Sequence, residues 1–397
     1  MRAFLRVTNL LLIAIPFGVE SEAVQWGKGL SFLLLCASII PLAGLNETFA
    51  DALIIRSKMQ LGNILNTVFT NLSFIILGLV ALYQGLGAVA QASVAGAIIS
   101  NTLFVLGAAL FMGHFRRQKQ EFEREHARGY AKFLVFILFA LVLPTLLQTT
   151  SAAIPGTSQV HQGPVGEFSV WAAFALLLIY GAYLLHDVFH VFDTEYHQRK
   201  NQQETPEDET ASKRLVRLGT LIRKEDTHAG RIPPPFAVIG LTVTALATVY
   251  VSFLLVAVTR DLTTGAAPFA VGPYNFATIH LSQTFVGLVI IPIIGSLAYN
   301  VNAIRAAMNG KADETVASTA GTAIQIALIA VPVFIIFSYF VLANSAFDLL
   351  FTKLEIVIIG LGAFIYYLVV EDGKGTWLEG CILMLCYLIF AVAVYFI

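Results

Sequence analysis

The sequence predicts an all-α integral membrane protein of about eleven transmembrane helices, built as two inverted five-helix repeats behind an N-terminal helix. The first observation is composition: 57% of the 397 residues are hydrophobic and only 12% are charged, whereas a soluble domain carries about 25% charged residues. The second is a series of apolar runs, each close to the roughly 20 residues that cross a bilayer. The third is a pattern of small and polar residues that occurs once in each half of the chain.

The apolar runs are expected to be helices, because lipid offers no hydrogen-bond partner to free backbone groups. In chain order they cover residues 8–24, 29–45, 63–83, 91–113, 131–150, 168–192, 235–258, 282–305, 315–342, 350–370 and 376–397.

One long polar stretch, residues 193–234, divides these helices. Its mixed charges and the prolines that follow are typical of a solvated linker. The sequence therefore predicts an N-terminal membrane half over residues 1–192 with helices 1–6, a cytoplasmic linker, and a C-terminal membrane half over residues 235–397 with helices 7–11. The linker is interpreted as a tether between the halves, with a regulatory segment as the alternative.

Lysine and arginine predict the orientation. With a cytoplasmic N-terminus, 21 of the 24 basic residues fall on the cytoplasmic side, and only Lys28, Arg260 and Lys353 fall on the other. This bias is of the kind that sets membrane topology. An odd number of helices then places the C-terminus in a lumen or outside the cell.

Composition also excludes some kinds of function. The net charge of −1 gives no basic excess for nucleic acid. Cys36, Cys381 and Cys386 lie within apolar runs, so they are interpreted as small buried residues and not as a disulfide or metal framework. We expect the lipid bilayer as a partner and neither a cofactor nor a bound metal, while the sequence leaves the oligomeric state undefined.

The two halves share the pattern S-x-A-G-x-x-I, from Ser93 in the first and from Ser318 in the second. In each half it begins nineteen residues after an aromatic residue, Phe74 or Tyr299. A repeat of five helices has an odd number of spans, so the halves must insert in opposite orientations. Inverted repeats of this kind place a site near the bilayer midplane, where the halves meet.

These segments resemble the calcium/proton exchangers of the calcium:cation antiporter superfamily. The resembling segments are Ile39–Ala43 (IIPLA), Val89–Ser93, Gly96–Asn101 (GAIISN), Val105–Gly107, Gly321–Leu328 (GTAIQIAL), Asp348–Thr352 (DLLFT) and Trp377–Gly380 (WLEG). The resemblance implies that each repeat carries a motif like G-N-A-x-E, whose glutamate binds the cation and exchanges it for protons. It places Phe74 and Tyr299 at the two glutamate positions, and Asn300 where the second repeat of the family has a histidine.

The loss of both acids guides the functional prediction. A dehydrated divalent cation needs oxygen ligands and usually carboxylate charge, and amides supply oxygens without charge. A charge-free, aromatic pocket instead suits a hydrophobic small molecule, and its rings attract cationic intermediates. The residues expected to bind this substrate are Phe74, Tyr299, Asn71, Asn300, Asn101 and Gln325.

The favoured function is a membrane-embedded terpene or meroterpenoid cyclase that protonates a prenylated or epoxidised substrate, similar to the integral-membrane cyclases of fungal secondary metabolism. Two alternatives stay open: a calcium or other cation/proton antiporter of an internal membrane, and a non-transporting regulatory homologue. Phe74 and Tyr299 serve equally well as a substrate wall or as a plug that fills a former ion cavity.

Three acids are candidate catalytic groups. Asp187 lies in the sixth predicted helix beside His186 and His190, as a proton donor or as a wetted interfacial cluster. Glu47 and Asp51, four residues apart just after the second predicted helix, act as acids, guard the cytoplasmic mouth, or belong to an amphipathic segment. By contrast, Glu355 and Glu379 lie near predicted helix starts, where a carboxylate stabilises the helix dipole.

Overall fold

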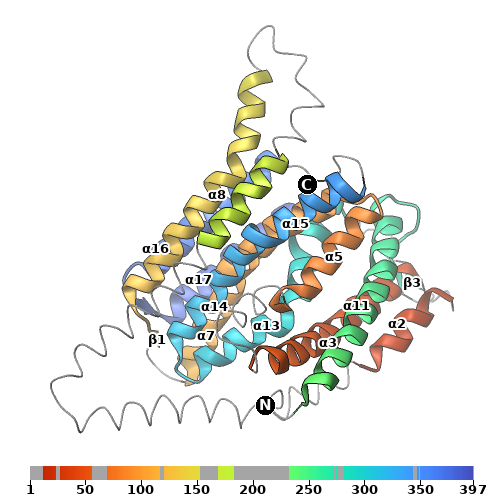
Figure 1. The fold of residues 1–397 in the computed structure, drawn as a ribbon, viewed down its shortest axis with the longest axis horizontal. Helices are drawn as coiled ribbons and strands as arrows, with labels where there is room; N and C mark the ends of the chain where they lie inside the picture. The colour runs from red at the N-terminus through yellow and green to blue at the C-terminus, as the bar shows by residue number, and fades with distance from the viewer. Residues whose placement is uncertain are drawn as a thin grey trace.

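The computed structural model describes residues 12–23, 27–55, 69–116, 120–152, 169–182, 232–271, 274–275, 281–342, 347 and 349–396. Within these ranges the protein is a bundle of helices with two short strand pairs (Figure 1). The first half contains α2 (Ala14–Ala23), α3 (Lys28–Ile54), α5 (Leu72–Tyr83), α6 (Gly87–Ile99), the π-helix η1 (Ser100–Val105), α7 (Leu106–Arg116), β1 (Gln120–Glu121), α8 (Arg124–Ala152) and a helix over Ser169–Ala182. The second half contains α11 (Pro234–Thr263), β2 (Ala270–Val271), β3 (Tyr274–Asn275), α12 (Gln283–Phe285), η4 (Val286–Ile290), α13 (Ile291–Met308), α14 (Ala312–Gln325), η5 (Ile326–Ala330), α15 (Val331–Ile336), η6 (Phe337–Val341), α16 (Lys353–Val370), β4 (Lys374–Gly375) and α17 (Trp377–Tyr395).

The predicted all-α membrane fold is confirmed. Seven helices in the described ranges are long and apolar enough to cross a membrane, or up to eight if the bent pair Gln283–Leu297 and Tyr299–Met308 forms one span. Leu72–Tyr83 and Ser169–Ala182 are shorter apolar helices. The total of eleven stays a prediction, because residues 1–11 and 183–231 lie outside the described ranges.

Helix α3 is longer than its apolar run, which predicted an end at residue 45. It continues to Ile54, because its last turns pack along α11: a Cβ placed on Gly240 of α11 would lie 2.5 Å from the Phe49 ring. Glu47 and Asp51 therefore lie inside a helix of the bundle, and not in a segment after it.

The two halves repeat each other at a constant separation of 225 residues. The first long span covers Gly87–Arg116 as α6, η1 and α7, and the second covers Ala312–Val341 as α14, η5, α15 and η6. The first residues of the two spans are 225 positions apart in the sequence (312 minus 87), and so are their last residues (341 minus 116). Each span is preceded by a turn at a glycine with φ of 78°, Gly85 or Gly310, a conformation that favours glycine.

The two related spans run in opposite directions. At one end, the backbone N–H of Glu123, which follows α7, donates to Asp313 Oδ1 at the start of α14 over 2.6 Å. At the other end, the Gln91 side chain near the start of α6 donates to the carbonyl of Leu350, which follows η6. Since the end of each span lies beside the start of the other, the repeat is inverted, as predicted.

Glycines allow the halves to approach closely. A Cβ on Gly96 of α6 would lie 2.6 Å from Leu288 Cα in η4. A Cβ on Gly107 of α7 would lie 2.8 Å from the carbonyl oxygen of Gly380 in α17. Small residues at such crossings let helix backbones pack against each other in a membrane.

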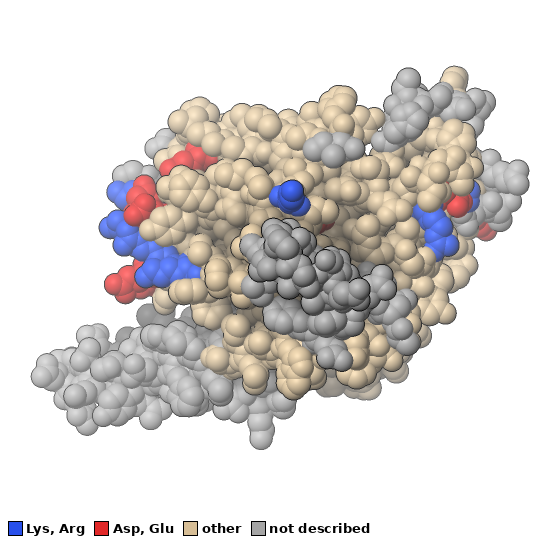
Figure 2. Space-filling model, turned by 90° about the horizontal axis from the view of Figure 1, so that it is seen from above, with Lys and Arg blue, Asp and Glu red and all other residues tan. Residues whose placement is uncertain are grey.

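Charged residues gather towards two ends of the molecule, and the face between them carries few (Figure 2). At one end, Lys28 forms an ion pair with Asp261 at 2.9 Å; we call this the Lys28 end. At the other, β1 pairs with β4 beside an ion pair between Arg128 and Glu371 at 3.4 Å; we call this the β1–β4 end. Two polar ends separated by an apolar belt match the arrangement that a bilayer imposes.

Candidate functional site

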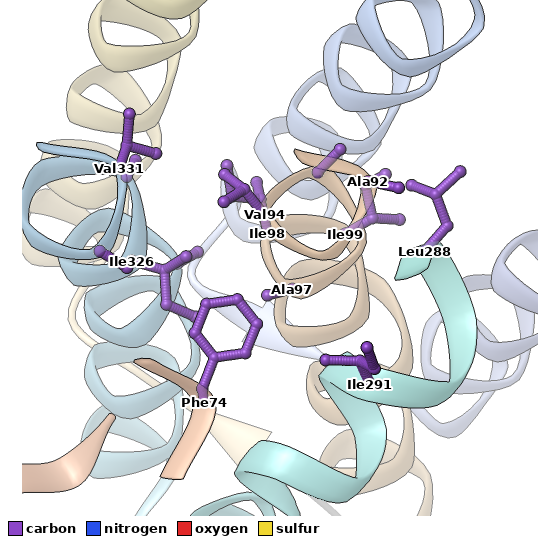
Figure 3. Packing of buried hydrophobic residues seen from close by; sticks show 14 of the residues in the cluster. Phe74, Ala92, Val94, Ala97, Ile98, Ile99, Leu288, Ile291, Ile326 and Val331 are labelled. Carbon is purple, nitrogen blue, oxygen red and sulfur yellow. The ribbon is translucent and has the colours of Figure 1, made fainter. Parts of the chain in front are cut away.

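Phe74 lies where α5 crosses α13 in the middle of the bundle. Its side chain has no exposed surface, and a Cβ on Gly295 of α13 would lie 3.3 Å from Phe74 Cα. The Phe74 ring packs on Phe334 with 6.2 Å between ring centroids. Figure 3 shows the ring pointing between Ile326 of η5 and Ala97 of α6.

Aromatic packing continues from Phe74 towards the Lys28 end. Phe334 meets Phe347 edge-on, with 5.5 Å between ring centroids. Gly78 of α5 leaves room for the Phe334 ring, which a Cβ at that position would overlap. Phe74 is therefore a packing residue in the centre of the bundle.

Polar side chains occupy the region between Phe74 and the β1–β4 end. Asn71, at the start of α5, donates through Nδ2 to Gln325 Oε1 of α14 over 3.1 Å. The Tyr299 hydroxyl of α13 lies close enough to Ser318 and Thr322, both of α14, for polar contact with their side chains. Ser318, Thr322 and Gln325 are spaced i, i+4 and i+7, so they form one face of α14.

Glu47 of α3 adds a carboxylate to this region. Asn302, one helical turn after Tyr299, donates through Nδ2 to Glu47 Oε1 over 2.8 Å. Arg305 in turn donates through Nη1 to Asn302 Oδ1 over 3.3 Å. Asp51, one turn beyond Glu47 on α3, lies close enough to act electrostatically on both Glu47 and Tyr299.

These side chains form a continuous set that joins four helices. We call it the polar file: Asp51, Glu47, Arg305, Asn302, Tyr299, Ser318, Thr322, Gln325 and Asn71.

Among the described residues, the polar file borders space that no side chain fills. Gly321 lies on the same face of α14 and is buried, yet a Cβ built on it would meet no described atom within 4 Å. Gln325 keeps part of its surface exposed although it lies in the interior of the 30-residue span Ala312–Val341. The polar file therefore provides neutral oxygens and the carboxylates of Glu47 and Asp51 between Phe74 and the β1–β4 end.

Nearly the whole chain matches one protein family. The profile of the sodium/calcium exchanger proteins matches residues 26–189 and 236–396. The chain belongs to the sodium/calcium exchanger protein family.

Individual relatives agree with this membership. A Ca(2+)/H(+) antiporter of Synechocystis sp. is 30% identical over 394 residues, which cover 98% of this chain and 97% of the relative. A Ca(2+)/H(+) antiporter of Aphanothece halophytica is 28% identical over 387 residues, which cover 97% and 95%. The structure of native YfkE superposes with a TM-score of 0.74 at 22% identity over 98% of this chain and 100% of YfkE, a likeness of fold.

Membership of the sodium/calcium exchanger family corrects the predicted cyclase function, which was wrong. The relatives that match over nearly their whole length are named as antiporters, so the antiporter alternative is better supported. The predicted hydrophobic small-molecule partner is corrected with it, because the family points to a transported cation. The prediction considered only the two helix positions of Phe74 and Tyr299 and treated their surroundings as charge-free, whereas α3 brings the Glu47 carboxylate to Asn302, one turn from Tyr299.

The other predicted site residues of this family member lie elsewhere. Asn101 is buried in η1 and donates through Nδ2 to the carbonyl of Ala97 over 2.8 Å. Asn300 is buried on α13, and its Oδ1 has no hydrogen-bond partner in the described part of the chain. Asp187, the favoured proton donor, lies outside the described residues.

Sequence reasoning missed four members of the polar file, Asn302, Arg305, Ser318 and Thr322. A signal was present, because Asn302 and Arg305 follow Tyr299 at intervals of three residues on one helix. Polar residues at helical spacing within an apolar span mark a face that avoids lipid.

Proposed function

We propose that this chain is an antiporter that exchanges an inorganic cation for protons across a membrane, with Glu47 as the group for which both compete. Family membership and relatives named Ca(2+)/H(+) antiporters support the exchange of a cation. The observation that carries the proposal is the Glu47 carboxylate, bonded across helices to Asn302 within the polar file.

The chemistry of a carboxylate fits this task. An acid inside a membrane segment is costly and is usually functional. When protonated, Glu47 is neutral and holds a cation weakly; when ionised, it attracts one. Because each ligand lowers the affinity for the other by the same factor, release of protons and uptake of the cation are coupled.

Its neighbours complete a route to the middle of the membrane. Asp51 adds negative charge nearer the β1–β4 end, where the cation would enter. Tyr299, Ser318 and Gln325 offer neutral oxygens that replace part of its hydration shell.

In this proposal the exchanging acid stands on a different helix from the one that the family resemblance implies. Phe74 and Tyr299 occupy the positions at which the resemblance places the two cation-binding glutamates. Phe74 is packed in the core, and Tyr299 joins the polar file through its hydroxyl. The carboxylate comes instead from α3.

Reconstituted transport tests the proposal. The purified full-length protein is placed in liposomes with an acidic interior and a trapped pH dye, and Na⁺, K⁺ or Ca²⁺ is added outside. For the unmodified protein, we expect the added cation to discharge the proton gradient. In Glu47→Gln the rate of this discharge should fall at least about tenfold, or ~1.4 kcal/mol, because an amide does not titrate.

Glu314→Gln is the matched control. Glu314 is exposed near the β1–β4 end and pairs with Lys311 on the surface at 2.7 Å. This variant should therefore transport like the unmodified protein. A wild-type protein that moves no protons with any of the three cations would contradict the proposal and favour the non-transporting alternative. Equal transport rates for Glu47→Gln and wild type would show that Glu47 is not the group at which protons and cation compete.

A further inference from the structure

Asn46 lies directly before Glu47 on α3 but contacts different helices. Its Nδ2 donates to Ser73 Oγ of α5 over 3.1 Å and to Thr248 Oγ1 of α11 over 3.0 Å. All three side chains are buried. Figure 1 shows α3 running beside α11, and the Asn46 amide is a point at which hydrogen bonds between side chains join α3, α5 and α11.

The hydroxyl of Thr248 defines the direction of this contact. It donates its own hydrogen to the Thr244 carbonyl of α11 over 2.8 Å, so towards Asn46 it acts as an acceptor. The Asn46 amide must therefore present its nitrogen to Thr248. Its Oδ1 is buried without a hydrogen-bond partner in the part of the chain that the structure describes. The two hydrogens of the amide, and not its oxygen, hold the three helices together.

Apolar packing alone does not hold α3 in one rotation. Around Asn46, the buried residues of this helix include Leu42, Ala43 and Ala50, and contact between such side chains is non-directional. Hydrogen bonds are directional, and a buried asparagine fixes the register of packed helices. If α3 turned or slid, the two amide hydrogens of Asn46 would be left unpaired in the interior, which is costly.

The rotation of α3 decides where Glu47 points. Consecutive residues of an α-helix are turned by about 100° from each other. With Asn46 held towards α5 and α11, Glu47 therefore leaves α3 in another direction, where Asn302 of α13 donates to its Oε1 over 2.8 Å. A side chain that fixes the rotation of α3 thus also fixes this contact.

We propose that Asn46 is a positioning residue for the exchange: it holds α3 in the rotation and register in which the Glu47 carboxylate meets Asn302. The inference rests on the proposed function at Glu47 and adds the group that orients this acid. Asn46 acts through the helix and does not itself contact the polar file.

Cross-linking measures the position of α3 without any need for transport. In a full-length variant that lacks the three native cysteines, Glu47→Cys and Asn302→Cys are joined by a short bifunctional thiol reagent, which can reach this exposed contact. Asn46→Leu is similar in size to the asparagine but donates no hydrogen bond. It should lower the initial rate of cross-linking at least about twofold, the low end of the coupling within one network.

Thr48→Val is the matched control. Thr48 directly follows Glu47, and its hydroxyl donates to the Gly44 carbonyl within α3 over 2.8 Å, so its loss should not change the cross-linking rate. Thr248→Val removes one of the two acceptors at constant shape and should lower the rate in the same direction as Asn46→Leu. The size-exclusion profile of each variant verifies that it is folded.

The liposome assay tests whether Asn46 acts through the contact of Glu47 with Asn302. With all native residues otherwise present, Asn46→Leu should slow the exchange at least about fivefold. In an Asn302→Leu background, which already lacks that contact, the same substitution should slow it less than about twofold. A general loss of stability would instead slow the exchange by the same factor in both backgrounds.

The outcomes separate this inference from the proposed function. An unchanged cross-linking rate in Asn46→Leu, or the same slowing of exchange in both backgrounds, overturns the inference and leaves the exchange function standing. If the unmodified protein exchanges no cation for protons but Asn46→Leu still slows the cross-linking, the exchange function is overturned and the positioning of Glu47 stands.

Discussion

At the level of single residues, Gly96 and Gly321 show how the two repeats have diverged. They are separated by the same 225 residues as the rest of the repeat (321 minus 96). Gly96 packs directly against the backbone of Leu288, whereas no described atom lies within 4 Å of a Cβ on Gly321. The same glycine thus closes a helix crossing in one half and borders open space in the other.

This difference predicts opposite effects of one substitution. Gly96→Ala should destabilise the protein by about 1–3 kcal/mol, because backbone must move to admit the methyl group. Gly321→Ala should leave stability unchanged or raise it by up to ~1 kcal/mol, because alanine favours the helix. Thermal unfolding of both variants in the same detergent measures this. A loss of stability in Gly321→Ala as large as that in Gly96→Ala would contradict the space beside Gly321, and no loss in Gly96→Ala would contradict the close helix crossing there.

At the level of elements, α16 and α17 begin with the same capping arrangement in different surroundings. The Thr352 N–H donates to Glu355 Oε2 over 2.7 Å, and the Thr376 N–H donates to Glu379 Oε2 over 2.8 Å. In both, the threonine hydroxyl accepts the glutamate N–H, which completes a capping box. Glu355 and Glu379 do lie at helix starts, as predicted, and the structure adds the capping bonds; Glu355 is buried, while Glu379 is partly exposed.

Burial should decide what each cap contributes. Glu355→Ala removes a buried carboxylate that accepts the Thr352 N–H, at a cost of about 1–2 kcal/mol, the order of a lost helix cap. Glu379→Ala should cost less, because water can replace the carboxylate. Hydrogen exchange of the first-turn amides of α16 and α17, together with the melting temperature, compares the two variants. A larger loss of stability in Glu379→Ala than in Glu355→Ala would contradict this prediction.

At the level of the whole molecule, the basic residues separate as the sequence predicts. Lys28 lies at one end with Asp261, and Arg260 donates to the carbonyl of Gln84 there. Arg128 lies at the β1–β4 end, and Lys374 belongs to β4 itself. Which end faces the cytoplasm stays a prediction from the basic bias, which assigns the β1–β4 end to that side.

Cysteine labelling tests this orientation. In a variant without Cys36, Cys381 and Cys386, a cysteine at exposed Glu125 should react with a membrane-impermeant maleimide from the cytoplasmic side only. A cysteine at exposed Tyr274, near the Lys28 end, should react only from the opposite side. The reverse labelling would invert the topology and move the entrance of the polar file to the other side of the membrane.

The sequence by itself determined the membrane class, the repeat around Gly96 and Gly321, and the position of Glu355 and Glu379 at helix starts. These features depend on apolar length, on periodicity and on contacts within a few residues, all of which are local. The sequence also singled out Glu47 as a candidate acid, within a cyclase function that family membership corrected.

Only the tertiary structure decided what surrounds that acid. Glu47 and Asn302 are 255 residues apart in the chain, and Asn71 and Gln325 are 254 apart. Whether such side chains meet depends on how far α3 continues beyond its apolar run and on how α5, α13 and α14 cross. Those crossings follow from the packing of side chains over the whole bundle, which no short stretch of sequence specifies.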